Sequence, residues 1–151
     1  MRLGLVRVRG ARYVLATVPA VPLDTAPRVL VVDDERHVRT MLCDLLTLWG
    51  CRPVPAAGAR EALARFAEGG WDLVLTDLIM PGMSGLDLVE RVRGQDASVE
   101  LIMLTAASAD LEAHARRLRF AVVRKPLPLA GLEAAVRDAL ARRRAGVART
   151  A

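Results

Sequence analysis

The stretch DLVLTDLIMPGMSGLDLV, residues 72–89, joins a short apolar run to a helical pattern through a turn that contains proline and glycine. The opening run DLVLT predicts a buried strand, and Leu86, Val89 and Val92 recur at the spacing of one helix face. A parallel strand needs a crossover, usually a helix, to reach its neighbour. The stretch therefore predicts a βα unit, with Asp77 directly after the strand.

The same alternation of an apolar run and a helical pattern recurs four more times along the chain. The other runs are RVLVV (28–32), RPVP (52–55), ELIML (100–104) and AVV (121–123). RPVP is predicted to be an edge strand or a very short one, because its prolines cannot donate to a ladder. Gly50 is predicted to cap the first helix. Five βα units predict an α/β fold, a doubly wound parallel sheet with helices on both faces.

Length and composition are those of one globular domain. The chain has 151 residues, of which 53% are hydrophobic and 26% charged, which is enough for a single core. Cys43 and Cys51 form no CxxC pair and have no histidine at metal-ligand spacing, so we expect two buried thiols in a reducing compartment. No apolar run approaches the roughly 18 residues of a membrane span. We therefore expect a cytoplasmic protein without membrane contact.

The net charge of +5 lies in the two ends of the chain. Residues 1–27 carry four arginines and one aspartate, and residues 140–151 carry four arginines and no acid, which leaves −2 for the remainder. Direct nucleic-acid binding is therefore not expected of the central body. Residues 1–26 are predicted to be an extension that is disordered or adds a strand. The domain is placed at 27–141, followed by a basic disordered tail at 142–151 and no output domain.

Polar side chains follow four of the predicted strands, at the edge where open parallel sheets bind ligands. Asp33 and Asp34 follow the first strand, Asp77 the third, Thr105 the fourth and Lys125 the fifth. Crowded carboxylates need a cation, and Mg²⁺ accepts hard oxygen ligands. An aspartate beside Mg²⁺ and a lysine can attack a phosphoryl group, and a threonine hydroxyl can hydrogen-bond a phosphoryl oxygen.

The lysine at this edge is the only one in the chain, which carries 21 arginines. A compact ammonium fits a narrow anionic pocket that a forked guanidinium does not. Each site residue also has a structural interpretation when it is taken alone: a helix N-terminal carboxylate, a turn residue, a cap or a solvated strand end. The hypothesis of a phosphoryl site rests on their coincidence at four strand ends.

Four segments together resemble the receiver domain of two-component response regulators. They are VLVVDDE (29–35), DLVLTDLIMPGMSGLDLV (72–89), LIMLTA (101–106) and RKP (124–126). The resemblance covers about residues 27–141 and implies a flavodoxin-like fold with strand order 2-1-3-4-5. It also implies that Asp77 is the phosphoacceptor, that Thr105 and Lys125 complete the catalytic set, and that the Lys125-Pro126 bond is cis.

The same resemblance implies a Mg²⁺ site. Asp34 and Asp77 would bind the ion directly, Asp33 would act mainly through a metal-bound water, and the backbone carbonyl of Ile79 would supply a further ligand. The implied protein is not an enzyme beyond its own phosphorylation and dephosphorylation. A metal-dependent phosphatase is disfavoured, because such enzymes need a second aspartate where Ile79 stands.

The implied function is a signalling switch. A histidine kinase or a histidine phosphotransfer protein would donate the phosphoryl group, and a downstream partner protein would read it, with the receiver a monomer or weak dimer. Val122 stands where most receivers carry a switch aromatic, Phe120 lies two residues earlier on the same strand face, and RLRF replaces the usual Gly-Ala before the last strand. Two alternatives therefore stay open: a phosphate-independent interaction module, and a phosphorelay intermediate or phosphate sink.

Overall fold

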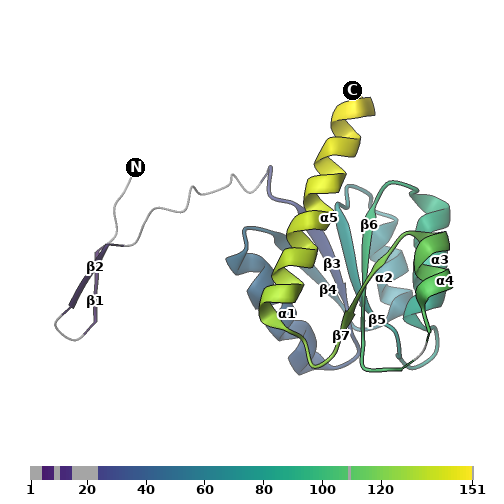
Figure 1. Ribbon diagram of the computed structural model, residues 1–151, viewed down its shortest axis with the longest axis horizontal. Helices are drawn as coiled ribbons and strands as arrows, with labels where there is room; N and C mark the ends of the chain where they lie inside the picture. The colour runs from purple at the N-terminus through teal and green to yellow at the C-terminus, as the bar shows by residue number, and fades with distance from the viewer. Residues whose placement is uncertain (1–4, 9–10, 15–23, 109, 151) are drawn as a thin grey trace.

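A five-stranded parallel sheet forms the centre of the computed structural model, which describes residues 5–8, 11–14, 24–108 and 110–150 (Figure 1). Its strands are β3 (Arg28–Val32), β4 (Arg52–Ala56), β5 (Leu73–Asp77), β6 (Glu100–Thr105) and β7 (Ala121–Arg124). They pair in the order β4-β3-β5-β6-β7, and every pairing is parallel. Numbered from the first strand of this sheet, the order is 2-1-3-4-5. The predicted flavodoxin-like arrangement is confirmed.

Helices cover both faces of the sheet, and strand alternation decides which residue meets which helix (Figure 1). The helices of the described segments are α1 (Arg36–Leu48), α2 (Ala59–Phe66), α3 (Gly85–Gln95), α4 (Glu112–Leu118) and α5 (Leu129–Thr150). Leu30 and Val32 pack in the cluster that α2, α3 and α4 cover, whereas Val29 and Val31 pack in the cluster that α1 and α5 cover. The hydrophobic core is therefore two layers with the sheet between them.

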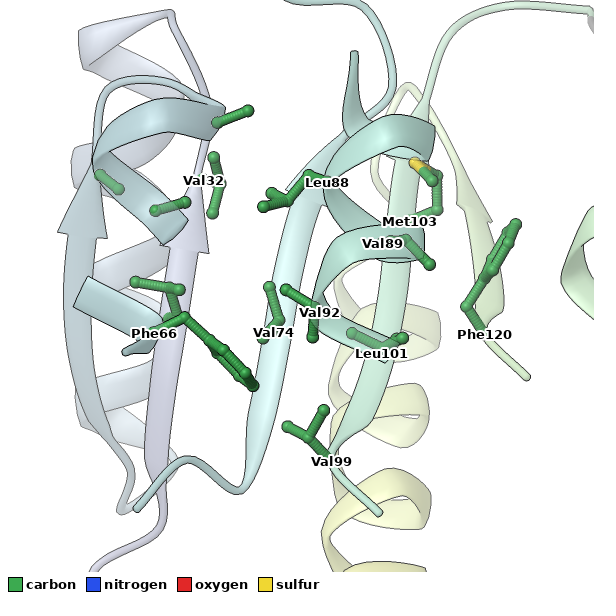
Figure 2. Close-up of a cluster of buried hydrophobic side chains, with 14 of the residues drawn as sticks. Val32, Phe66, Val74, Leu88, Val89, Val92, Val99, Leu101, Met103 and Phe120 are labelled. Atoms are coloured by element: carbon green, nitrogen blue, oxygen red, sulfur yellow. The ribbon is translucent and has the colours of Figure 1, made fainter. Parts of the chain in front are cut away.

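Figure 2 shows the first of these layers. Val74, Leu101 and Met103 of the central strands face Phe66 of α2 and the side chains of α3. Leu88, Val89 and Val92 of α3 are completely buried there, which accounts for the apolar spacing seen in the sequence. Burial of a side chain of this size contributes about 1.5–3 kcal/mol to folding.

Helix α1 ends just before Gly50, the residue that was predicted to cap it. Gly50 has a φ of 81°, a left-handed conformation that glycine adopts without strain. Its N–H donates to the carbonyl of Thr47 at 3.1 Å, and the N–H of Cys51 donates to the carbonyl of Leu46 at 2.9 Å. These two bonds form the Schellman arrangement and direct the chain into β4.

The basic tail predicted to be disordered is helical, and that prediction was wrong. Helix α5 continues to Thr150 without interruption, well past residue 141. Alanine and arginine are strong helix formers, and two of the tail arginines have partners on the body of the domain. Arg142 pairs with Glu100 at 3.0 Å, and Arg143 donates to the carbonyl of Trp71 at 3.3 Å.

The N-terminal extension, predicted to be disordered or to add a strand, contains two short strands. Strands β1 (Leu5–Val8) and β2 (Ala11–Val14) pair antiparallel in a two-stranded sheet of their own, separate from the central one. The rest of the first 23 residues lies outside the described part of the chain. Across the segments that are described, no helix combines the length and the apolar character of a membrane span.

Both cysteines are free thiols, but only one is buried as predicted. Cys51 is 8% exposed, whereas Cys43 is only partly covered. Burial raises the pKa of each thiol, which keeps both in the protonated, weakly nucleophilic form.

Arg93 ties α4 to α3 and to the loop before β6. Its Nε donates to the carbonyl of Leu118 at 2.9 Å, and its Nη2 donates to the carbonyl of Arg119 at 3.0 Å. Its Nη1 donates to three carbonyls of the loop, those of Asp96, Ala97 and Val99. Arg119 follows α4 with a φ of 54°, a left-handed conformation that is uncommon for a residue other than glycine. One guanidinium thus holds a strained helix end in place.

Candidate functional site

The register of the sheet brings the predicted site residues to one edge. Asp77 is the last residue of β5 and is the register partner of Leu104, which directly precedes Thr105. Thr105 in turn is the register partner of Arg124, and Lys125 follows. Asp33 comes directly after β3. Residues that are far apart in the sequence therefore meet because parallel strands end on the same side.

Three carboxylates gather at this edge. Oxygen atoms of Asp33, Asp34 and Asp77 lie within 4.8 Å of one another. Asp33 is fully buried, Asp77 is 8% exposed, and Asp34 is exposed to solvent. Carboxylates this close repel one another unless a cation or a proton lies between them.

Asp33 carries the clearest sign that a cation belongs here. Its Oδ1 accepts the N–H of Glu35 at 2.8 Å, whereas its buried Oδ2 has no hydrogen-bond partner among the described residues. Burial raises the pKa of Asp33, although the hydrogen bond from Glu35 and the charge of Lys125 lower it. The Lys125 ammonium forms an ion pair with this Oδ2 at 3.5 Å but no hydrogen bond. This donor set of hard oxygens fits Mg²⁺, which also retains water ligands.

Lys125 places its ammonium between two of the carboxylates. Its Nζ lies 3.3 Å from Oδ2 of Asp77 and 3.5 Å from Oδ2 of Asp33. Burial lowers the pKa of Lys125, but the charges of Asp33 and Asp77 outweigh it, and the net shift is upward. The ammonium therefore stays charged at neutral pH.

The backbone around Lys125 fixes its direction toward the site. The N–H of Lys125 donates to the carbonyl of Thr105 at 2.9 Å, which extends the parallel ladder by one step. The Lys125-Pro126 peptide bond is cis, as the resemblance implied. The single lysine of the chain thus stands where its ammonium meets two carboxylates of the site.

Thr105 is completely buried at the end of β6. Its Oγ1 accepts the N–H of Ala107 at 3.0 Å, and the described residues offer no acceptor for the hydroxyl hydrogen. The hydroxyl is therefore held in place with its donor available. Ile79, whose carbonyl is an expected further metal ligand, has a side chain that is 66% exposed in the loop before α3.

Gly85 supports Asp77, which the sequence did not predict. A Cβ atom on Gly85 would lie 1.9 Å from the carbonyl oxygen of Asp77, so no larger residue fits against that backbone. The N–H of Gly85 donates to the carbonyl of Leu78 at 2.8 Å. Ser84 and Asp87 form a capping box that fixes this first turn of α3. The SG pair directly before an apolar helical pattern was the available sequence signal.

The two candidates for a switch residue differ in burial. Phe120 is 7% exposed and packs in the core layer near Val89 and Met103 (Figure 2). Val122 packs against the same layer but is only partly buried, and it is the register partner of Met103. The two side chains share a face of the strand, as predicted. The aromatic ring, however, lies at the start of β7, away from the carboxylates.

Residues 29–137 match the family described as the response regulator receiver domain, so the chain belongs to this family of two-component signalling modules. It is 38% identical over 84 residues to the sensory transduction protein RegX3 of Mycolicibacterium smegmatis, which covers 56% of this chain and 36% of that protein. It is 34% identical over 119 residues to the DNA-binding transcriptional regulator NtrC of Azospirillum brasilense, which covers 77% of this chain and 24% of that protein. The chain thus spans about a quarter to a third of these relatives.

Solved structures agree with this assignment. The chemotaxis protein CheY4 of Vibrio cholerae is 28% identical with a TM-score of 0.71, over 77% of this chain and 100% of that one. The response regulator TrrA of Thermotoga maritima is 33% identical with a TM-score of 0.70, over 76% of this chain and 99% of that one. The TrrA structure is a complex with Mg²⁺ and beryllofluoride. Receiver domains of this kind are signalling modules rather than enzymes of metabolism.

Gly85→Ala is expected to destabilise the domain by about 3 kcal/mol, because overpacking against backbone forces the Asp77 loop or α3 to move. Gly94→Ala is the matched control, since Gly94 lies in the same helix with nothing within 4 Å of its missing Cβ. That control should be neutral or stabilising by up to about 1 kcal/mol. Urea unfolding monitored by circular dichroism measures both. Equal stability of the two variants would refute the close approach at Asp77.

Proposed function

We propose that Asp77 accepts a phosphoryl group from a histidine kinase or a histidine phosphotransfer protein. The observation that carries the proposal is the position of the Lys125 ammonium, 3.3 Å from the carboxylate of Asp77 and 3.5 Å from that of Asp33. An ammonium at this point can hold a phosphoryl oxygen as it leaves its donor. Family membership and the shape of the site both support this role.

The transfer is a substitution at phosphorus. A carboxylate oxygen of Asp77 forms the new bond to phosphorus while the bond from phosphorus to the imidazole nitrogen of the donor breaks. Lys125 and the hydroxyl of Thr105 each hold one of the phosphoryl oxygens, on which charge is spread in the transition state. Because both side chains are fixed by the backbone of β6 and β7, they need little reorganisation when the group arrives.

We further propose that Asp34 and Asp77 bind Mg²⁺ directly, with the carbonyl of Ile79 as a further ligand and Asp33 acting mainly through a water. The ion supplies positive charge that offsets carboxylate repulsion and the charge of the phosphoryl group. The spacing of the three carboxylates supports this ligand set, as does the Oδ2 of Asp33, which has an ion pair but no hydrogen bond in the described residues. The exposure of Asp34 gives the ion and its waters a way in from solvent.

The phosphorylated receiver would signal through a partner protein, as a monomer or weak dimer. With Val122 in place of the usual aromatic, we propose that Thr105 and α4 carry the change. Thr105 contacts the phosphoryl group, and the loop that follows it leads into α4. The partly buried Val122 also favours a second candidate, a phosphate sink that takes up phosphate without a conformational response.

Asp77→Asn is expected to abolish phosphorylation by acetyl phosphate in the presence of Mg²⁺, because the amide is a poor nucleophile. Intact mass spectrometry of the wild type should show one added phosphoryl group that disappears when Mg²⁺ is chelated. Asp138→Asn, a change in an exposed carboxylate on α5, should be labelled like the wild type. Undiminished labelling of Asp77→Asn would move the phosphoacceptor to another residue.

Mg²⁺ alone is expected to raise Tm by about 2–5 °C at ten times its Kd, because it binds the folded site and not the unfolded chain. Asp34→Ala should remove this effect more completely than Asp33→Ala. Glu35→Ala, a change in the adjacent exposed carboxylate outside the three-carboxylate cluster, is the control and should keep it. A full Mg²⁺ response in the Asp33→Ala and Asp34→Ala double variant would show that the ion binds elsewhere.

Beryllofluoride with Mg²⁺ is expected to change amide exchange in the segment from Thr105 to Arg119, if α4 carries the signal. Hydrogen exchange followed by mass spectrometry measures this segment and the loop after Asp77 separately. Asp77→Asn with the same reagents gives the background. A change confined to the loop after Asp77, with none from Thr105 to Arg119, would exclude the switch and favour the phosphate sink.

A further inference from the structure

A second cavity lies at the opposite end of the sheet from the carboxylates. It is a cleft of about 910 Å³ between the last turns of α5 and the first residues of β6 and β7. Glu100 and Ala121 mark those strand starts, and Gly146 and Val147 mark the helix. Figure 1 shows this end of α5 continuing past the sheet. The cleft exists because the tail that the sequence predicted to be disordered is helical.

Four guanidinium groups line this cleft, and two of them lack an acidic partner. Arg142 pairs with Glu100 at 3.0 Å, and Arg143 lies 3.8 Å from Asp72 and 3.9 Å from Asp96. Arg93 and Arg119 donate to backbone carbonyls, and neither forms an ion pair with any carboxylate in the described residues. Positive charge therefore remains uncompensated where α4 ends.

The pKa of Arg93 is also consistent with an excess of positive charge in this cleft. Burial lowers the pKa of Arg93, and the neighbouring charge of Arg119 lowers it further, more than nearby carboxylates raise it. Two like charges held close together by backbone contacts create a position that an anion would stabilise. Arginine suits phosphate in particular, because its planar fork makes paired hydrogen bonds to phosphate oxygens.

The remaining lining is partly apolar, and Ser98, Thr150 and Glu100 add polar groups to it. Phe120, Ala121 and Val147 contribute carbon surface, and Val147 is 52% exposed. The volume lies within the range of about 300–1,000 Å³ that is typical of small-molecule sites. The occupant that fits has one anionic group for the arginines and a flat or apolar body for this surface.

We propose that the cleft binds a small organic phosphate of nucleotide size. The phosphate lies at Arg119, which has no acidic partner in the described residues, and beside Arg142, which also pairs with Glu100. The rest of the molecule packs on Val147 and Ala121. A single phosphate matches the charge, because the four guanidinium groups have three carboxylates within 4 Å, those of Glu100, Asp72 and Asp96, which leaves one positive charge. The site is separate from Asp77, so it stands or falls independently of the phosphoryl-transfer proposal.

The test uses the full chain with adenosine monophosphate as the probe, in EDTA so that the carboxylate site holds no metal. Isothermal titration calorimetry should show saturable binding at one site. Adenosine and inorganic phosphate should each bind at least about tenfold more weakly, since each lacks one half of the contacts. Asp77→Asn should bind the probe as the wild type does. Loss of binding in that variant would place the probe at the carboxylates and overturn the proposal.

A double variant, Arg119→Gly with Arg142→Gln, should weaken the probe at least about tenfold, since it removes two charged donors. Glycine keeps the left-handed φ of 54° at position 119, so the helix end is preserved. Arg137→Gln is the matched control, because Arg137 is also on α5 and also pairs with a glutamate, Glu133, but lies outside this cleft. Its affinity should be unchanged.

Three further results would overturn the proposal. They are the absence of saturable binding in the wild type, an equal loss of affinity in Arg137→Gln, and adenosine binding as tightly as its phosphate. A single-stranded oligonucleotide that binds more tightly than adenosine monophosphate, and loses affinity steeply with salt, would instead assign the arginines to nucleic acid. Inorganic phosphate that binds as tightly as the nucleotide would reject the apolar half of the site.

Discussion

Parallel pairing of β3, β5, β6 and β7 is the constraint on which the rest of the molecule depends, because it collects all strand ends on one edge and all strand starts on the other. The ends carry Asp33, Asp77, Thr105 and Lys125, so the acidic site is assembled by the ladder rather than by local sequence. The starts of β6 and β7 border the arginine cleft, which α5 completes. The two sites therefore have opposite charge and share a rigid sheet.

At the acidic edge, buried carboxylates lie close together and one ammonium does not neutralise all of them. One ammonium faces the carboxylates of Asp33 and Asp77, and Asp34 adds a third acid in solvent. The local charge is thus negative even with Lys125 in place, and one buried oxygen of Asp33 has no hydrogen-bond partner in the described residues. Such an arrangement costs stability and is of the kind that a divalent cation would stabilise, as proposed above. The crowding of carboxylates thus accounts both for the proposed metal binding and for the cost in stability.

The grouping of the candidate site residues at one edge could be predicted from the sequence because they follow apolar runs, and the strand order was known from the family that those residues resemble. What could not be predicted depends on contacts between distant segments. The helical tail is held by Arg142 on Glu100 and by Arg143 on the carbonyl of Trp71. The support from Gly85 depends on how closely α3 approaches Asp77. The polar composition of the tail predicted a disordered segment. Its partners on the body of the domain, which the sequence does not show, help to hold it as a helix.

Arg93 fixes one end of α4, so any rotation of this helix would displace mainly its other end. Its hydrogen bonds hold the carbonyls of Leu118 and Arg119, whereas the opposite end of the helix lies toward Thr105. A helix of seven residues is about 10 Å long, so a rotation of about 10° around the fixed end displaces the free end by roughly 2 Å. A partner bound at the free end of α4 would be displaced by most of that distance. A partner bound at the end beside Arg93 would be displaced by almost none of it.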